Sequence, residues 1–452
     1  MNRTLKTSYN LRMLENKTLI DRSLQAVWHP CTQMKHHESY PLVPITRGEG
    51  VWLYDAEGKR YLDAVSSWWV NLFGHNHPHI KDAIKQQLDT LEHVMLAGFT
   101  HEPVVALSEQ LAKLTGLGHA FYASDGASAT EIALKMSFHY WRNTGNPSKS
   151  KFISLQNSYH GETLGALGVT DVAIFKDTYA PLLMQSAQMP SPDFRLAEVG
   201  ESAEQFALRC ANALETYVAA HHAELAAFII EPLVQCAAGM GMYHPLYLQR
   251  AREICTQYQI HLIADEIAVG FGRTGTLFAC EQAGGQVSDI ADFVCLSKGI
   301  TGGYLPLSVV LTRDAIYQAF YDDRTVKGFL HSHSYTGNPL ACSAALATLA
   351  LFEQTQTILA NQALSQYIRQ EMQVLTHLPI QHLRHQGMIH AFDVITQNKD
   401  FSRDCYAAGL AQGILLRPIG NAVYWMPPYV ISHEEIDWLL VRTVKAIAQA
   451  NL

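Results

Sequence analysis

The chain has 452 residues, of which 48% are hydrophobic and 16% are charged. This composition provides enough apolar material for a large buried core, and it excludes a disordered or fibrous chain. The 33 basic and 41 acidic side chains give a formal net charge of −8, and no Lys/Arg-rich run is present. We therefore expect neither a nucleic acid nor a membrane as a partner.

The cysteines and the apolar runs indicate the cellular compartment of the protein. Eight cysteines are scattered without a C-x-x-C pair, which is typical of a reducing compartment. The apolar runs, such as Ala226–Ile230, are too short to cross a bilayer. Met1–Asp21 lacks the continuous apolar stretch of a secretory signal. We expect a cytoplasmic enzyme.

The first 65 residues are mixed in character. A polar, helix-like start ends at Trp28-His29-Pro30, and the alternating runs Leu42–Ile45 and Val51–Tyr54, followed by a Glu57-Gly58 turn, predict a hairpin.

Between about residue 80 and residue 330, short apolar strands alternate with amphipathic helices. The predicted strands are Ala120–Ala123, Lys151–Leu155, Ala226–Ile230, His261–Ala264, Asp292–Leu296 and Leu307–Leu311. The predicted helices are His79–Leu91, Pro103–Leu114, Ala129–Trp141, Ala203–His221 and Pro245–Tyr258. Such alternation predicts an α/β fold whose mostly parallel sheet is covered on both faces.

A smaller α+β region is predicted after about residue 335. Its predicted elements are the helices Pro339–Phe352 and Leu359–Leu375, the strands Ile389–Val394 and Val423–Met426, and a helix from Glu434 onward. We expect residues 66–335 to form the large domain. Residues 336–452 would form the small domain, to which residues 1–65 contribute.

Ligands of open α/β sheets bind beyond the carboxyl ends of the strands, so the residues there deserve most weight. Asp265 directly follows one predicted strand, and Lys298 follows the next. Taken alone, Asp265 is better explained as a helix cap or a structural ion pair, and Lys298 as a surface lysine. Their alternative roles are a carboxylate that keeps a ring nitrogen protonated and an amine that forms a Schiff base with a carbonyl.

Two further strand ends carry suitable groups. Ser124–Ser128 offers small residues at a helix N-terminus, where backbone N–H groups can surround a phosphate. Tyr159 follows another strand and offers a ring to stack on a flat ligand. A capped helix and a packed loop tyrosine would explain each alone. Together, the four features are those that pyridoxal 5'-phosphate requires.

The chain also resembles the class III aminotransferases of fold type I along nearly its whole length. The residues that carry this resemblance are Ile229-Ile230-Glu231-Pro232, Ala264-Asp265-Glu266-Ile267, Gly270-Phe271-Gly272-Arg273-Thr274-Gly275 and Ser297-Lys298-Gly299-Ile300-Thr301-Gly302-Gly303. The resemblance implies a pyridoxal-phosphate-dependent transferase with a seven-stranded-type sheet and a homodimer with shared active sites.

The resemblance also assigns roles to residues. Lys298, Asp265 and Tyr159 would be catalytic, with Lys298 bound to the cofactor aldehyde and Asp265 paired with its ring nitrogen. The other cofactor contacts would be Gly126 and Ala127, with His333 and Ser334 reaching from the partner subunit. Besides Tyr159 and Lys298, the substrate contacts would be Cys31, Trp68, Ser332 and Arg417, with Arg417 binding the carboxylate of a keto acid.

Within the family, the chain is most similar to the branch that aminates 8-amino-7-oxononanoate to 7,8-diaminononanoate in biotin biosynthesis. The residues behind this finer resemblance are Trp28-His29-Pro30, Ser66-Ser67-Trp68-Trp69, Tyr159-His160-Gly161, Gly337-Asn338-Pro339-Leu340-Ala341-Cys342, Leu416-Arg417-Pro418 and Met426-Pro427-Pro428-Tyr429. S-adenosylmethionine is the expected amino donor. Lysine as the donor, or another ω-amino acid transaminase activity, remains an alternative.

Two patterns point elsewhere and are rejected. Gly270-x-Gly272-x-x-Gly275 matches a dinucleotide-binding fingerprint, but it does not follow its strand directly and no helix opens after it. The His75-x-His77-x-His79 and His331-x-His333 runs lack the carboxylate spacing of a metal site, and we expect no metal.

Overall fold

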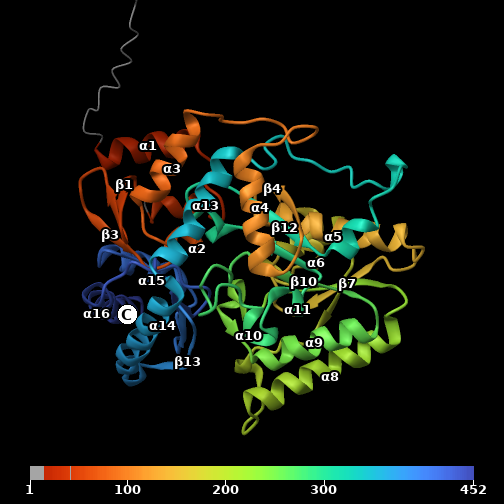
Figure 1. The fold of residues 1–452 in the computed structure, drawn as a ribbon. Coiled ribbons are helices and arrows are strands. Elements are labelled where there is room, and N and C mark those ends of the chain that lie inside the picture. The colour runs from red at the N-terminus through yellow and green to blue at the C-terminus, as the bar shows by residue number, and fades with distance from the viewer. Residues whose placement is uncertain (1–14, 41, 452) are drawn as a thin grey trace, which may run out of the picture.

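The structure is a computed structural model that describes residues 15–40 and 42–451. Its centre is a seven-stranded sheet (Figure 1). The strand order is β4 (His119–Ala123), β12 (Ser308–Thr312), β11 (Phe293–Leu296), β10 (His261–Asp265), β7 (Leu225–Ile230), β5 (Lys151–Leu155) and β6 (Ala187–Met189). Only β12 runs against the others, pairing antiparallel with β11 and β4. The mostly parallel sheet is therefore confirmed.

The central strands are apolar along their whole length because both faces of the sheet are buried. In β11, Phe293 and Cys295 join a core that includes α5 (Gly126–Asn143), whereas Val294 and Leu296 join a second core. That second core includes the inner faces of α4 (Glu102–Thr115), α8 (Ala203–His221) and α9 (Pro245–Gln257). Alternate side chains of one strand thus pack on opposite helix layers.

Three smaller sheets complete the fold. The first contains β1 (Ile45–Glu49), β2 (Trp52–Asp55), β3 (Arg60–Asp63) and β15 (Ile414–Leu415). The others are β13 (Ile380–Gln386), β14 (Ile389–Val394) and β16 (Ala422–Trp425), and the pair β8 (Val234–Gln235) and β9 (Gly241–Met242). Because β3 pairs with β15, an early segment of the chain lies against a late one.

The remaining helices cover the sheets and connect them. They are α1 (Asn16–Ala26), α2 (Ser66–Trp69), α3 (Pro78–Leu88), α6 (Leu164–Val169), α7 (Ala173–Lys176), α10 (Glu281–Gly284), α11 (Val287–Ile290), α12 (Asp314–Gln318), α13 (Pro339–Gln354), α14 (Thr357–Glu371), α15 (Phe401–Ala411) and α16 (His433–Ala450). Short 3-10 segments are Met34–Glu38, Asp177–Leu182, Phe194–Leu196, Cys236–Ala238, Lys298–Thr301, Thr325–Lys327 and Met372–His377. Among the helices that the structure describes, none is both long and apolar enough to cross a membrane.

Most predicted elements are present within one to three residues of their expected ends, and one strand was misplaced. The first strand of the predicted hairpin was expected at Leu42–Ile45, whereas in the structure this strand is β1, which begins at Ile45. Pro44 explains the difference, because proline has no N–H to donate to a strand ladder. The predicted start of the chain lies partly outside the described residues, which contain α1 from Asn16 onward.

The loop after β10 is fixed by a buried carboxyl. Glu266 is fully buried and accepts hydrogen bonds from the N–H groups of Ala279 (2.9 Å) and Cys280 (2.8 Å). Burial raises the pKa of Glu266 from 4.5 to about 7. The Gly270-x-Gly272-x-x-Gly275 segment is part of this loop and is not followed by a long helix, as expected.

We expect Glu266→Gln to change how stability depends on pH. Because the pKa of Glu266 is higher in the folded protein, its protonated form contributes to the free energy of unfolding. This contribution is fully present below pH 4.5 and is lost as the pH rises to about 7. The wild type should lose up to roughly 3 kcal/mol of unfolding free energy relative to the variant across this interval. Urea unfolding at several pH values measures the difference. Parallel curves for the two proteins would show that Glu266 does not titrate there.

Candidate active site

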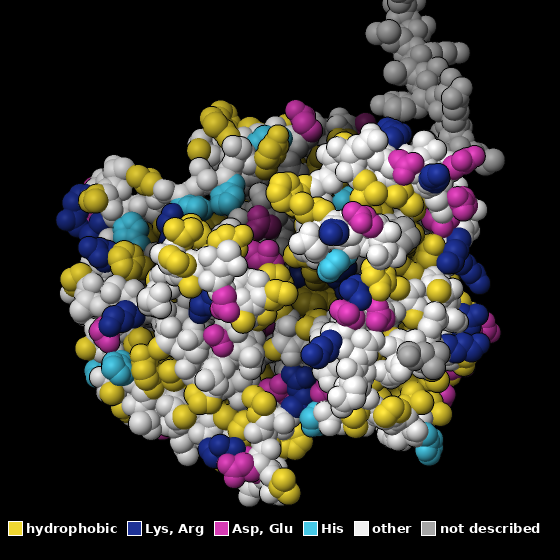
Figure 2. All heavy atoms as spheres, turned by 180° about the vertical axis from the view of Figure 1, so that it is seen from behind, with side chains coloured by type: hydrophobic (Ala, Val, Ile, Leu, Met, Phe, Trp, Pro, Cys, Tyr) yellow, Lys and Arg dark blue, Asp and Glu magenta, His cyan; other side chains and the backbone are white. Residues whose placement is uncertain are grey.

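A cavity of about 1590 Å³ opens at the carboxyl ends of the central strands. Seen from behind, the molecular surface is hollowed near its upper centre, and basic, acidic and apolar side chains are interspersed around the hollow (Figure 2). The cavity is lined by eight of the residues that the sequence analysis selected: Cys31, Trp68, Gly126, Ala127, Tyr159, Asp265, Lys298 and Arg417. These residues come from segments almost 400 positions apart, and the fold brings them together.

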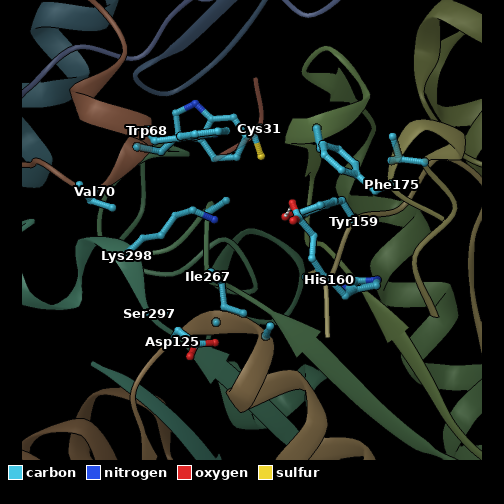
Figure 3. A pocket seen from close by; sticks show the side chains of 18 of the residues that line it. Cys31, Trp68, Val70, Asp125, Tyr159, His160, Phe175, Ile267, Ser297 and Lys298 are labelled. Carbon is cyan, nitrogen blue, oxygen red and sulfur yellow. Dashed lines mark hydrogen bonds between the residues drawn. The ribbon is translucent and has the colours of Figure 1, made fainter. Parts of the chain in front are cut away.

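Lys298 follows β11 and extends into the middle of this cavity, with Tyr159 across from it (Figure 3). Its Nζ lies 5.1 Å from the centroid of the Trp69 ring. Within the described chain, no hydrogen bond or ion pair engages this amine. Burial lowers the pKa of Lys298, although Asp265 and Glu231 oppose the effect. A buried amine with a lowered pKa is suited to react as a nucleophile and as a base.

Asp265 ends β10, the strand next to β11, and lies opposite Cys295 in the parallel pairing. Its Oδ2 is 2.7 Å from Nδ1 of His160, and its Oδ1 accepts the N–H of Ile267 at 3.1 Å. His160 is buried, and its Nε2 has no hydrogen-bond partner among the described residues. The carboxylate is thus oriented by a histidine to which the sequence analysis gave no role.

Glu231 is a second residue that lacked a predicted role. It directly follows β7, lines the cavity and is buried. Its carboxyl accepts the N–H groups of Tyr159 (3.0 Å) and Cys236 (3.3 Å), and burial beside Asp265 raises its pKa well above 4.5. It therefore holds the backbone of Tyr159 in place. Its position at a strand end was the available signal, as for Asp265.

A group of backbone N–H donors faces the cavity at the start of α5. The N-cap side chain of Asp125 accepts the N–H of Ser128 at 2.9 Å, and no acceptor within the described chain engages the N–H groups of Gly126 and Ala127. A Cβ at Gly161 would lie 2.6 Å from the Cβ of Ala127, so only glycine allows the two loops to approach this closely. Free N–H groups at a helix N-terminus suit a phosphate.

Aromatic and charged groups form the outer wall. The hydroxyl of Tyr159 donates to Glu162 at 2.8 Å, and the Arg417 guanidinium lies 4.5 Å from the Trp68 ring. Cys31 lies beside Trp68 (Figure 3). Burial and the charge of Glu162 raise the pKa of the Cys31 thiol. This wall therefore combines one guanidinium with flat apolar surfaces.

The four residues labelled α2, Ser66–Trp69, form a left-handed turn rather than a right-handed helix, and this turn carries the two tryptophans. Ser66, Ser67, Trp68 and Trp69 all have positive φ angles, of 50°, 47°, 74° and 72°. A left-handed backbone costs a residue with a Cβ roughly 1–2 kcal/mol, so neighbouring groups must hold this turn. No sequence pattern used here predicts it.

Three predicted site residues lie elsewhere. Ser332, His333 and Ser334 do not line the cavity of their own chain. His333 is 3.0 Å from His331, which in turn is 2.8 Å from the Lys135 Nζ. The described residues contain no group of three His, Cys, Asp or Glu side chains that could hold a metal ion.

The cavity fits the cofactor that the sequence analysis expects. Pyridoxal phosphate presents an aldehyde, a ring nitrogen and a phosphate. For these the cavity offers the amine of Lys298, the Asp265 carboxylate, and the N–H groups of Gly126 and Ala127. Within residues 15–40 and 42–451, this amine and these two N–H groups have no hydrogen-bond partner.

Comparisons with known proteins agree with this chemistry. The family described as Aminotransferase class-III matches residues 33–447. A Helicobacter pylori protein named adenosylmethionine-8-amino-7-oxononanoate aminotransferase is 47% identical, over 93% of this chain and 95% of that protein. A Geobacter sulfurreducens protein of the same name is 39% identical, over 96% of this chain and 98% of that protein.

Solved structures show the same fold. The crystal structure of an adenosylmethionine-8-amino-7-oxononanoate aminotransferase from Methanocaldococcus jannaschii superposes with a TM-score of 0.90 at 35% identity, covering 97% of this chain and all of that one. An omega transaminase from Pseudomonas jessenii, in complex with PMP, also has a TM-score of 0.90, at 27% identity, covering 96% of this chain and 98% of that one. The chain therefore belongs to the class III aminotransferase family.

Proposed function

We propose that the protein transfers an amino group from S-adenosylmethionine to 8-amino-7-oxononanoate, giving 7,8-diaminononanoate for biotin synthesis, with pyridoxal phosphate as cofactor. The observation that carries the chemistry is the Lys298 amine, which has no partner in the part of the chain that the structure describes and shares one cavity with Asp265. The relatives named above, up to 47% identical over nearly the full chain, support the choice of substrates. The omega transaminases share the fold at lower identity, so the fold alone does not select the substrate.

The cofactor, when bound, supplies an aldehyde that takes up the amino group and a ring that delocalises the electron pair left on the substrate carbon. Lys298 would hold the aldehyde and, once released, move the proton through Nζ. The lowered pKa keeps a larger fraction of this amine uncharged and able to accept a proton. Asp265, oriented by His160, would keep the ring nitrogen protonated.

Both substrates must use the same cavity in turn. Arg417 would bind the carboxylate of the keto acid, because a guanidinium can donate two parallel hydrogen bonds to it. Trp68 and Tyr159 supply flat apolar surface for an aliphatic chain or a nucleoside.

We also propose a homodimer with shared active sites. Ser332, His333 and Ser334 lie outside the cavity of their own chain, which is compatible with a role in the partner's site. Leu330 and Tyr335 beside them are exposed apolar side chains that a partner would cover. The proposed domains are residues 66–335 and residues 336–452 with 1–65, and the β3–β15 pairing supports this grouping.

The amino donor can be identified in a single half-reaction. The cofactor-loaded protein is incubated with S-adenosylmethionine or with lysine, without keto acid, and the deaminated donor is counted by mass spectrometry. We expect about one equivalent per active site from S-adenosylmethionine and none from lysine. Subsequent 8-amino-7-oxononanoate should then yield 7,8-diaminononanoate. Deamination of lysine alone would make lysine the donor, and turnover of neither pair would refute the proposed function.

We expect Arg417→Ala to weaken the keto-acid half-reaction selectively. Loss of a charged hydrogen-bonding partner should reduce kcat/KM for 8-amino-7-oxononanoate roughly 10- to 100-fold, with a much smaller change for the donor. Arg442→Ala is a matched control, because Arg442 also stacks on a tryptophan, Trp438, at 3.8 Å. Equal losses in both half-reactions of the Arg417 variant would contradict the role of Arg417.

A further inference from the structure

The left-handed turn Ser66–Trp69 places both tryptophans of the cavity. Trp69 lies under the Lys298 amine, and Trp68 lies against the Arg417 guanidinium. Four successive residues with a Cβ do not keep positive φ angles unless their surroundings hold them. The contacts that hold this turn therefore help to determine where the two rings lie, together with the hydrogen bond that the Trp69 indole N–H donates to the Tyr424 hydroxyl at 3.1 Å.

The middle of the turn is held by a buried carboxylate. Asp63, the last residue of β3, has no exposed surface. Its Oδ2 accepts a hydrogen bond from the hydroxyl of Ser67 at 2.7 Å and lies 3.0 Å from Nε2 of His75. Asn71 Nδ2 donates to Nδ1 of the same ring at 3.2 Å, so Nε2 carries the ring proton and donates it to Asp63.

Within the described chain, the other hydrogen bonds of the turn are made by its first and last residues, and the backbone N–H of Trp69 donates to the carbonyl oxygen of Val65 at 2.9 Å. Ser66 donates its hydroxyl proton to the carbonyl oxygen of Met426 at 2.7 Å. Arg273 donates to the carbonyl oxygen of Trp69 at 3.4 Å. Among the described residues, Ser67, the residue directly before Trp68, makes one hydrogen bond, which its hydroxyl donates to Asp63.

We propose that Asp63 is a positioning residue that, through Ser67 and with support from His75, holds the left-handed turn so that Trp68 and Trp69 face Arg417 and Lys298. Asp63 does not line the cavity. Its effect on the reaction is therefore transmitted through the turn and appears mainly in how the carboxylate substrate is bound.

Three variants separate positioning from stability. Ser67→Ala removes the hydroxyl and Asp63→Ala removes the acceptor. Asp63→Asn keeps one oxygen that can occupy the place of Oδ2 and receive both donors, while its NH2 group takes the place of Oδ1 and loses the 3.3 Å bond from the Val65 N–H. Ser202→Ala is the matched control, since it also removes an exposed serine hydroxyl that makes a hydrogen bond, to the Gln205 N–H at 3.2 Å.

The first measurement is the turnover of 8-amino-7-oxononanoate, and its interpretation rests on the proposed function. We expect Ser67→Ala and Asp63→Ala to lower kcat/KM for 8-amino-7-oxononanoate roughly 10- to 100-fold, mostly through KM. Asp63→Asn should recover to within about threefold of the wild type. Ser202→Ala should keep wild-type kinetics.

The second readout does not need activity. The holoenzyme is labelled with 5-fluorotryptophan at its seven tryptophans, and the 19F resonances of Trp68 and Trp69 are assigned with Trp68→Phe and Trp69→Phe. In Ser67→Ala and Asp63→Ala these two resonances should shift or broaden while the other five stay in place. Asp63→Asn and Ser202→Ala should leave all seven unchanged.

The outcomes are distinct. If Asp63→Ala only lowers the melting temperature, with unchanged kcat/KM and unchanged Trp68 and Trp69 resonances, Asp63 is merely structural and the proposal is overturned. Moved resonances with unchanged kcat/KM would also overturn it. If the wild type does not turn over 8-amino-7-oxononanoate, the proposed function fails, and the 19F spectra still decide whether Asp63 positions the tryptophans.

Discussion

Lys298→Ala is expected to reduce kcat by at least about 10³-fold, because in the proposed function Lys298 is the group that would both hold the aldehyde and move the proton. Within the described chain, Lys298 is the amine that the cavity presents without a partner, beside Asp265 and Glu231. Steady-state kinetics with S-adenosylmethionine and 8-amino-7-oxononanoate measures the loss. Borohydride reduction of the wild type should add the mass of the cofactor to the peptide that contains Lys298, and the variant should gain none.

Lys59→Ala is the matched control for this experiment. The Nζ of Lys59 lies 4.9 Å from the centroid of the Tyr61 ring, much as that of Lys298 lies against Trp69, but Lys59 is on the protein surface. The control should keep full turnover and the labelled Lys298 peptide. Turnover in Lys298→Ala within about tenfold of the wild type would exclude Lys298 as the group that moves the proton.

The sequence predicts the centre of the site because ligands of a mostly parallel sheet bind at a predictable place along its strands. Buried strands are continuous apolar runs, and the first polar side chain after such a run lies at the ligand-binding edge. Asp265 and Lys298 follow two such runs, and in the structure they line one cavity. Trp68 and Arg417 lie outside these strands and were predicted only through the family resemblance.

The partners of these residues were not predictable in the same way. His160 contacts Asp265 across 105 positions of the chain, and such a pairing depends on packing that periodicity does not encode. The turn at Ser66–Trp69 is held by Asp63 against local preference, because serine and tryptophan do not favour positive φ angles. The edge strand β6 has only three residues, too few for a hydrophobic period to be recognised.

Asp265→Asn tests the second half of the site. An asparagine has almost the same shape and can still accept the N–H of Ile267, but it carries no charge to keep a ring nitrogen protonated. We expect kcat to fall roughly 10²- to 10³-fold in both half-reactions, since the ring must accept electrons whichever substrate is bound.

The neighbouring strand offers a matched control for this variant. Asp292 lies just before β11, at the opposite end of the sheet, where it pairs with Arg252 (2.8 Å) and Arg313 (2.9 Å) and accepts the N–H of Leu262. Asp292→Asn therefore also neutralises a largely buried carboxylate, but far from the cavity chemistry. Asp292→Asn should lower the melting temperature and leave kcat unchanged. Asp265→Asn should instead lower kcat strongly and change the melting temperature less than Asp292→Asn does. If both variants lost stability and activity in the same proportion, the effect of Asp265 would be on folding, and its assignment to the ring nitrogen would be wrong.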